Sequence, residues 1–143
     1  MLIRKSAVLV VLTLLLSSCS SYRAYNRGEE CGKSIKSYTK LVRWNEMEKA
    51  VLNLVVAEQR SAYSQLAETI RRRGITMVDV RILAQECRAE QGSAEATVEF
   101  DYFFTAENRL KTITDRQQWA YQTDQADEKV SGWKLTSPPP PFK

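Results

Sequence analysis

The spacing of apolar residues changes its period near Gly74. Before this glycine, apolar residues recur every three to four positions, which predicts two amphipathic helices over 37–55 and 56–73. Ser37 is a suitable N-cap for the first helix. The arginine run 71–73 before Gly74 is typical of a helix end, and it also suits phospholipid headgroups. The two apolar stripes consist of Tyr38, Leu41, Val42, Met47, Val51, Leu54 and Val55, and of Val56, Tyr63, Leu66, Ala67 and Ile70.

After Gly74, apolar and polar residues alternate, as in half-buried strands. We expect strands over 75–88, 94–104, 110–122 and 131–137, with a charged loop at 123–129. The apolar faces would carry Val78, Val80, Ile82 and Ala84, then Ala94, Ala96, Val98, Phe100, Tyr102 and Phe104, then Ile113, Gln117, Trp119 and Tyr121 with Asp115, and finally Trp133 and Leu135.

The order of these elements predicts an α+β fold. Two helices precede long strands with short connections, so we expect the helices to cover one face of a curved antiparallel sheet of about four strands. The prolines 138–141 end the last strand because proline cannot donate to a ladder. Phe142 would pack on the sheet, or the proline run would be a polyproline ligand for an aromatic groove.

The first eighteen residues have the pattern of an export signal. Arg4 and Lys5 precede an apolar run over 7–16 that is interrupted only by Thr13. A spanning helix needs roughly 20 residues, so we expect this run to be removed rather than to cross a membrane. Its end, Leu16-Ser17-Ser18-Cys19, resembles a bacterial lipobox. An ordinary cleaved signal with a nearby cysteine is the alternative.

The lipobox resemblance implies that Cys19 becomes the first mature residue and carries acyl chains such as palmitate. Two or three chains anchor a protein almost permanently. Ser20 stands where an Asp would imply retention at the inner membrane, so the resemblance implies the periplasmic leaflet of a Gram-negative outer membrane. We therefore expect a signal peptide over 1–18, a flexible tether over 19–35 and a folded domain over 36–143.

The tether is expected to be a coil because it is rich in Ser, Gly and charge. Fifteen flexible residues span about 20 Å. Tyr22 and Tyr25 within it suit either solvent or lipid headgroups.

Composition removes several classes of function. The 143 residues contain no His, which excludes His-dependent catalytic triads and His-ligated zinc. Removing 1–18 takes away two basic residues and no acidic one, so the net charge falls from +4 to +2. So small a charge does not favour nucleic acid as a partner. We expect no metal and no cofactor.

Two cysteines remain besides Cys19. In an oxidising compartment, Cys31 and Cys87 would form a disulfide or remain free thiols. A metal or redox role is disfavoured because no Cys-x-x-Cys motif is present.

The helix–helix–strand–hairpin order, with Gln117-Gln118-Trp119, the strand Gly132-Trp133-Lys134-Leu135 and a proline-rich end, resembles the nuclear transport factor 2-like (NTF2-like) superfamily over about 36–142. The resemblance implies a cone-shaped, cystatin-like sheet. Enzymes of that superfamily place an Asp, often with His or Tyr, inside the cone, and the open sheet face is commonly a dimer interface.

The candidate interior site rests on strand alternation and aromatic content. Its residues are Trp44, Tyr102, Asp115, Trp119, Tyr121 and Trp133, which would line a pocket for an apolar ligand or simply fill the core. Asp115 would act as a general base if buried, whereas a bulge in its strand would turn it to solvent.

The candidate partner face is the other side of the sheet. Leu83 and Phe103 are its apolar residues and would mark a docking surface for a protein partner or a second copy. Glu95, Glu99, Asp101 and Arg81 share this face, where cross-strand charge pairing also accounts for them.

These observations favour a non-enzymatic, membrane-anchored periplasmic lipoprotein that acts as a binding or assembly module. The alternative is a carrier of small apolar ligands, or a vestigial NTF2-like lyase, isomerase or hydrolase, that uses the cone. A third hypothesis is a chaperone-like component of outer-membrane assembly, for which no motif matches.

Overall fold

The computed structural model describes residues 2–123 and 131–143, with side chains described from residue 21 onward. The predicted charged loop therefore lies almost entirely outside the described residues. In chain order the elements are α1 (Leu2–Arg43), α2 (Met47–Leu54), the 3₁₀ turn η1 (Ala57–Gln59), α3 (Arg60–Arg73), β1 (Ile75–Arg88), β2 (Ser93–Phe104), β3 (Leu110–Gln122) and β4 (Gly132–Leu135).

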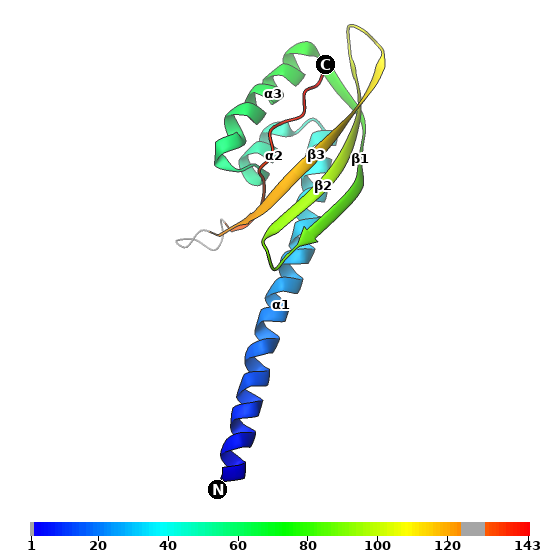
Figure 1. The fold of residues 1–143 in the computed structure, drawn as a ribbon. Helices are drawn as coiled ribbons and strands as arrows, with labels where there is room; N and C mark the ends of the chain where they lie inside the picture. Colours follow the sequence, from blue (N-terminus) through cyan, green and yellow to red (C-terminus); the bar gives the residue numbers. More distant parts are fainter. Residues whose placement is uncertain (1, 124–130) are drawn as a thin grey trace.

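The four strands form one antiparallel sheet in the order β1-β2-β3-β4. The sheet is curved, and the helices lie against one of its faces (Figure 1). This arrangement confirms the predicted α+β class. The boundaries predicted for the first and third strands agree with β1 and β3.

The core fills the space between helices and sheet. Every second residue of β2 from Ala94 to Phe104 is buried, as the alternation predicts. The largest fully buried side chains include Trp119 and Trp133 from the sheet, and Tyr38 and Tyr63 from the helices. Phe142 is buried beside Phe100 and Tyr102, so the proline tail packs against the sheet.

The predicted helix over 37–55 is wrong in its boundaries. Its first part is the end of α1, and its second part is α2. Asn45 between them has φ 60°, a left-handed conformation that Asn tolerates better than most residues. The Glu46 amide donates to the Leu41 carbonyl at 2.8 Å, which closes the turn.

The segment 19–35, which we expected to be a flexible tether, is helical throughout as part of α1. Cys31 and Ile35 are fully buried, one helical turn apart, and continue the stripe that Tyr38 and Val42 form. The prediction missed this stripe because it begins with a cysteine in a polar, glycine-containing segment. In the described ranges, no helix is long and apolar enough to cross a membrane.

The predicted inward face of β1 is wrong in part, because the strand has two register shifts against β2. They lie between Met77 and Asp79 and between Ile82 and Ala84, so that Val78 and Leu83 have no partner residue in β2. Each such bulge reverses the alternation. Val80 and Ile82 therefore pack against the core as predicted, whereas Val78 and Ala84 are exposed.

A disulfide joins the helix layer to the sheet. Cys31 of α1 is bonded to Cys87 near the end of β1, with 6.3 Å between their Cα atoms. The two residues are 56 positions apart in the chain, so the bond closes a long loop. Of the two alternatives that the sequence allowed for these cysteines, a disulfide or free thiols, the structure has the disulfide.

We predict that replacing both cysteines, Cys31→Ala with Cys87→Ala, lowers the free energy of unfolding by up to about 4 kcal/mol, because the unfolded chain regains the entropy that this loop removes. Urea unfolding of the two proteins measures the difference. Reducing agent should shift the wild-type midpoint and leave that of the double variant in place. Equal midpoints for both proteins would contradict the prediction.

Candidate functional site

The candidate interior site is a row of polar side chains along β3. The register between β2 and β3 advances without a shift, so Asp115, Gln117 and Trp119 all face the helices and all are buried. The Gln117 amide Nε2 donates to Asp115 Oδ2 at 2.9 Å, and Trp119 Nε1 donates to Gln117 Oε1 at 3.2 Å. β3 therefore has no bulge that turns Asp115 to solvent.

Two tyrosines from the helices close the space above this row. The Tyr38 ring of α1 lies 5.9 Å from the Trp119 ring and 6.4 Å from that of Tyr63 in α3, both in edge-to-face geometry. The Tyr63 hydroxyl donates to the Ser137 carbonyl at 3.2 Å. The Tyr38 hydroxyl is buried and has no hydrogen-bond partner among the described residues.

Burial governs the electrostatics of this cluster. It raises the pKa of Asp115 above its ordinary value, while the hydrogen bond from Gln117 acts in the opposite direction. Burial also raises the pKa of Tyr38 and of Tyr63, and the nearby Asp115 carboxyl adds to both shifts. The tyrosine hydroxyls therefore stay protonated at neutral pH.

The six residues predicted to line one pocket are not brought together. Trp119 and Asp115 meet in the row described above. Trp133 and Tyr121 form an edge-to-face pair near the disulfide end of the sheet. Tyr102 lies toward the C-terminus, where its hydroxyl donates to the Lys143 carbonyl at 3.0 Å.

Trp44 is the clearest departure from the predicted pocket. It lies in the turn after α1 and is 66% exposed, with the Arg43 guanidinium over its ring. The turn at Asn45, which the helical periodicity did not predict, turns this side chain away from the core.

The predicted partner face carries an ion-pair network. Arg81 of β1 donates to Asp79 at 2.7 Å, to Asp101 at 2.6 Å and to Glu99. Hydrogen bonds from the Arg81 guanidinium lower the pKa of Asp79 and of Asp101. Cross-strand pairing thus accounts for these charges, as one interpretation of the sequence held.

The two apolar residues of that face do not form one patch. Leu83 is 54% exposed at the second bulge of β1, between the Ile82–Val98 and Ala84–Thr97 pairs. Phe103 is half-buried opposite Thr76, seven positions along β1 and therefore about 20 Å from Leu83. They are two separate features at different ends of the sheet.

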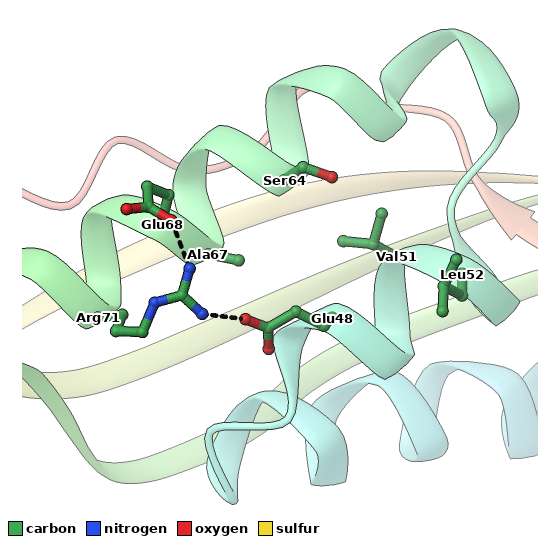
Figure 2. A pocket seen from close by; sticks show the side chains of 7 residues that line it. All are labelled: Glu48, Val51, Leu52, Ser64, Ala67, Glu68 and Arg71. Atoms are coloured by element: carbon green, nitrogen blue, oxygen red, sulfur yellow. Dashed lines mark hydrogen bonds and ion pairs between the residues drawn. The ribbon is translucent and has the colours of Figure 1, made fainter.

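A groove between α2 and α3 escaped the sequence analysis. It has a volume of about 420 Å³ and is lined by Glu48, Val51, Leu52, Ser64, Ala67, Glu68 and Arg71. Figure 2 shows Arg71 of α3 bonded to Glu68 of the same helix and reaching across to Glu48 of α2. The Arg71–Glu48 bond measures 2.8 Å and links α3 to α2.

The groove arises where the predicted first helix breaks. α2 is a separate short helix. Its exposed Leu52 and buried Val51 line the groove together with Ala67, a small residue of α3. A single helix over 37–55 would have hidden this arrangement. The signal in the sequence was Asn45, a turn-forming residue within an otherwise helical period.

Comparison with known proteins adds information on the fold only. No protein-family model and no curated protein matches the chain. A crystal structure of a SEC-C motif containing protein from Psychrobacter arcticus aligns over 82% of this chain with a TM-score of 0.58 and 8% identity, and this chain spans 64% of that protein. The intermembrane space region of the chloroplast protein ARC6 aligns with a TM-score of 0.45 and 10% identity, over 77% of this chain and 92% of that one.

The opposite pKa shifts of Asp115 and Asp79 predict opposite effects of pH on two matched variants. An unfolded Asp titrates near 3.9. Because the folded pKa of Asp115 is raised, the unfolded chain ionises first as the pH rises, and stability falls between the two pKa values. Asp115→Asn should therefore gain stability relative to wild type as the pH rises from 3 to 7.

Asp79→Asn is the control for this experiment. The folded pKa of Asp79 is lowered, so its contribution to stability is present above the unfolded pKa and is lost as the pH falls through the folded pKa. The variant should lose stability relative to wild type at pH 7, and the loss should shrink toward pH 3. Urea unfolding across this range gives both curves, and a pH-independent difference for Asp115→Asn would contradict the assignment.

Proposed function

We propose that this chain is a bacterial lipoprotein, anchored through acylated Cys19 in the periplasmic leaflet of the outer membrane, whose domain is a non-enzymatic binding or assembly module. The anchor is supported by the lipobox Leu16-Ser17-Ser18-Cys19 after a short apolar run. The side chain of Cys19 lies outside those that the structure describes. The partner is a protein or a second copy of the chain.

The observation that carries the binding role is the filled interior in front of Asp115. Tyr38 packs against both Tyr63 and Trp119, and all three are buried, in the interior that the proposed NTF2-like architecture would assign to a substrate. Asp115 itself is engaged by Gln117 rather than by an open cavity. A domain with this interior is better suited to act through its surface.

The proposal includes an NTF2-like architecture for the domain. It is supported by the packing of helices on one face of a curved sheet, and by the burial of Gln117, Trp119 and Trp133, the residues on which the sequence resemblance rests.

The surface that we propose for the partner is the edge of the sheet around Leu83. β1 is an edge strand of the described sheet, and its exposed apolar residues Val78 and Leu83 both lie at bulges. Bulges oppose the addition of another strand to an edge. A partner would therefore contact side chains here, with Leu83 as the apolar centre beside the charged network of Arg81.

A specific observation favours the alternative of a small-ligand carrier or vestigial enzyme. The Tyr38 hydroxyl is buried, makes no hydrogen bond with the described residues, and lies near the Tyr63 hydroxyl and the Asp115 carboxyl. Unsatisfied buried groups are uncommon and often occur at sites of function. A ligand in this role would be small, with one polar atom that accepts a hydrogen bond from the Tyr38 hydroxyl.

We predict that Cys19→Ser moves the protein from the membrane fraction to the soluble periplasmic fraction, because the acyl chains are its main attachment. Fractionation of cells that express each form measures this, and mass spectrometry of the mature N-terminal peptide of the wild type should show the lipid. Ser61→Ala, at an exposed position of α3 outside the lipobox, serves as a control that keeps Cys19. If both forms stayed in the same fraction, the anchor proposal would fail.

For the binding surface, we predict that Leu83→Asp abolishes association with the partner, because a charge replaces the apolar centre of the contact. Chemical crosslinking of the lipidated protein in native membranes, followed by purification, reports the association. Leu110→Asp is the matched control, since Leu110 is 61% exposed but lies at the far end of β3. Equal loss of crosslinks in both variants, or in neither, would count against the Leu83 surface.

A further inference from the structure

We propose that α1 is a rigid stalk that holds the domain in one orientation on the lipid surface, with the β1–β2 turn toward the membrane. This inference rests on the proposed anchor at Cys19. In this orientation the domain has a second contact, the lipid surface, which is distinct from the protein partner. The observations that carry it are the contacts that fasten α1 to one end of the sheet.

The first fastening involves Arg27, eight residues after Cys19. Its backbone carbonyl accepts a hydrogen bond from Trp133 Nε1 at 2.8 Å. Its guanidinium lies 4.6 Å from the centre of the Tyr121 ring. Trp133 and Tyr121 are in edge-to-face contact with each other. The end of β3 and the start of β4 therefore contact the helix at the same point.

The second fastening joins the next turn of α1 to β1. A Cβ atom placed on Gly28 would lie 3.7 Å from that of Ala89, and one on Gly32 would lie 3.4 Å from Gln85. These distances place the backbone of the helix in close approach to β1 and its turn. The covalent Cys31–Cys87 bond lies between the two glycine contacts. Helix and sheet thus move as one body from Arg27 onward.

The reach of the stalk follows from helix geometry. Because α1 is continuous from residue 2 to residue 43, eight residues separate Cys19 from Arg27 at about 1.5 Å each, or about 12 Å in all. A flexible tether over 19–35 would have allowed any orientation. A helix of this length instead keeps the β1–β2 turn close to the lipid. Figure 1 shows this turn at the end of the domain from which α1 projects, with the β2–β3 turn at the opposite end.

The exposed side chains of the stalk fit a lipid surface. Tyr22 and Tyr25 are 68% and 71% exposed and lie one turn apart on the helix. Tyrosine favours the membrane interface because its ring is apolar and its hydroxyl polar. The first charged residue after Cys19 is the exposed Arg23, and the first acidic residue is Glu29, which suits anionic phosphates close to the anchor.

The test compares two labels at opposite ends of the sheet. The lipidated protein carrying Glu90→Cys, in the β1–β2 turn, or Glu107→Cys, in the β2–β3 turn, is labelled with a fluorophore and reconstituted into phosphatidylcholine–phosphatidylglycerol vesicles with a headgroup-attached spin-label quencher. Both positions are exposed glutamates. We expect quenching at position 90 to be at least threefold stronger than at position 107.

Two further variants separate a rigid stalk from simple proximity. Ala24→Pro interrupts the helix between the anchor and Arg27, and should bring the two quenching values to within a factor of about 1.5. Ala24→Ser keeps the helix and should retain the difference. Circular dichroism and vesicle flotation confirm that each variant is folded and anchored.

The outcomes distinguish the stalk from the anchor. Equal quenching at positions 90 and 107 in protein that floats with the vesicles would overturn the fixed orientation and leave the anchor in place. An unchanged difference in Ala24→Pro would overturn the role of the helix. Wild-type protein that carries no lipid and fails to float would overturn both the anchor and the inference that rests on it.

Discussion

The attachment of α1 to the sheet is the constraint on which the rest of the fold depends. The Cys31–Cys87 bond and the hydrogen bond from Trp133 to Arg27 fix the helix along one end of the sheet. That position allows Ile35 and Tyr38, farther along the same helical face, to enter the core. The break at Asn45 then directs the chain into α2 and α3 over the remaining sheet face. Through the buried residues Cys31, Ile35, Tyr38 and Val42, the C-terminal half of α1 becomes the central support of a small core.

The sequence predicted the sheet better than the helices, and the reason is physical. β2 and β3 alternate regularly because one of their faces is covered and the other faces solvent, so Phe100 and Trp119 could be placed inward from period alone. The bulges at Val78 and Leu83 were beyond prediction because alternation carries no information on where a strand gains a residue. The helical state of 19–35 depends on tertiary contacts of Cys31 and Ile35 that local composition does not reveal.

The candidate site was predicted in part for similar reasons. Asp115 and Trp119 share a face by periodicity, but the residues that close over them, Tyr38 and Tyr63, come from helices whose packing the pattern did not specify. Trp44 was misplaced because a helical period cannot show that the helix stops one residue earlier. Packing between residues far apart in the sequence therefore decides whether the space beside a row of polar residues is an open cavity or a filled core.

If the proposed anchor confines the chain to a membrane surface, the bulged edge of β1 gains importance. Confinement to two dimensions raises local concentration and limits rotation, which favours contact between neighbouring edges. A flat edge strand under those conditions would template continuous sheet growth. The unpaired positions at Val78 and Leu83 interrupt the ladder between β1 and β2 twice within a single strand, and such bulges oppose the pairing of another strand with this edge. The same bulges would therefore limit strand-by-strand growth between neighbouring copies on a membrane, if the proposed anchor holds them there.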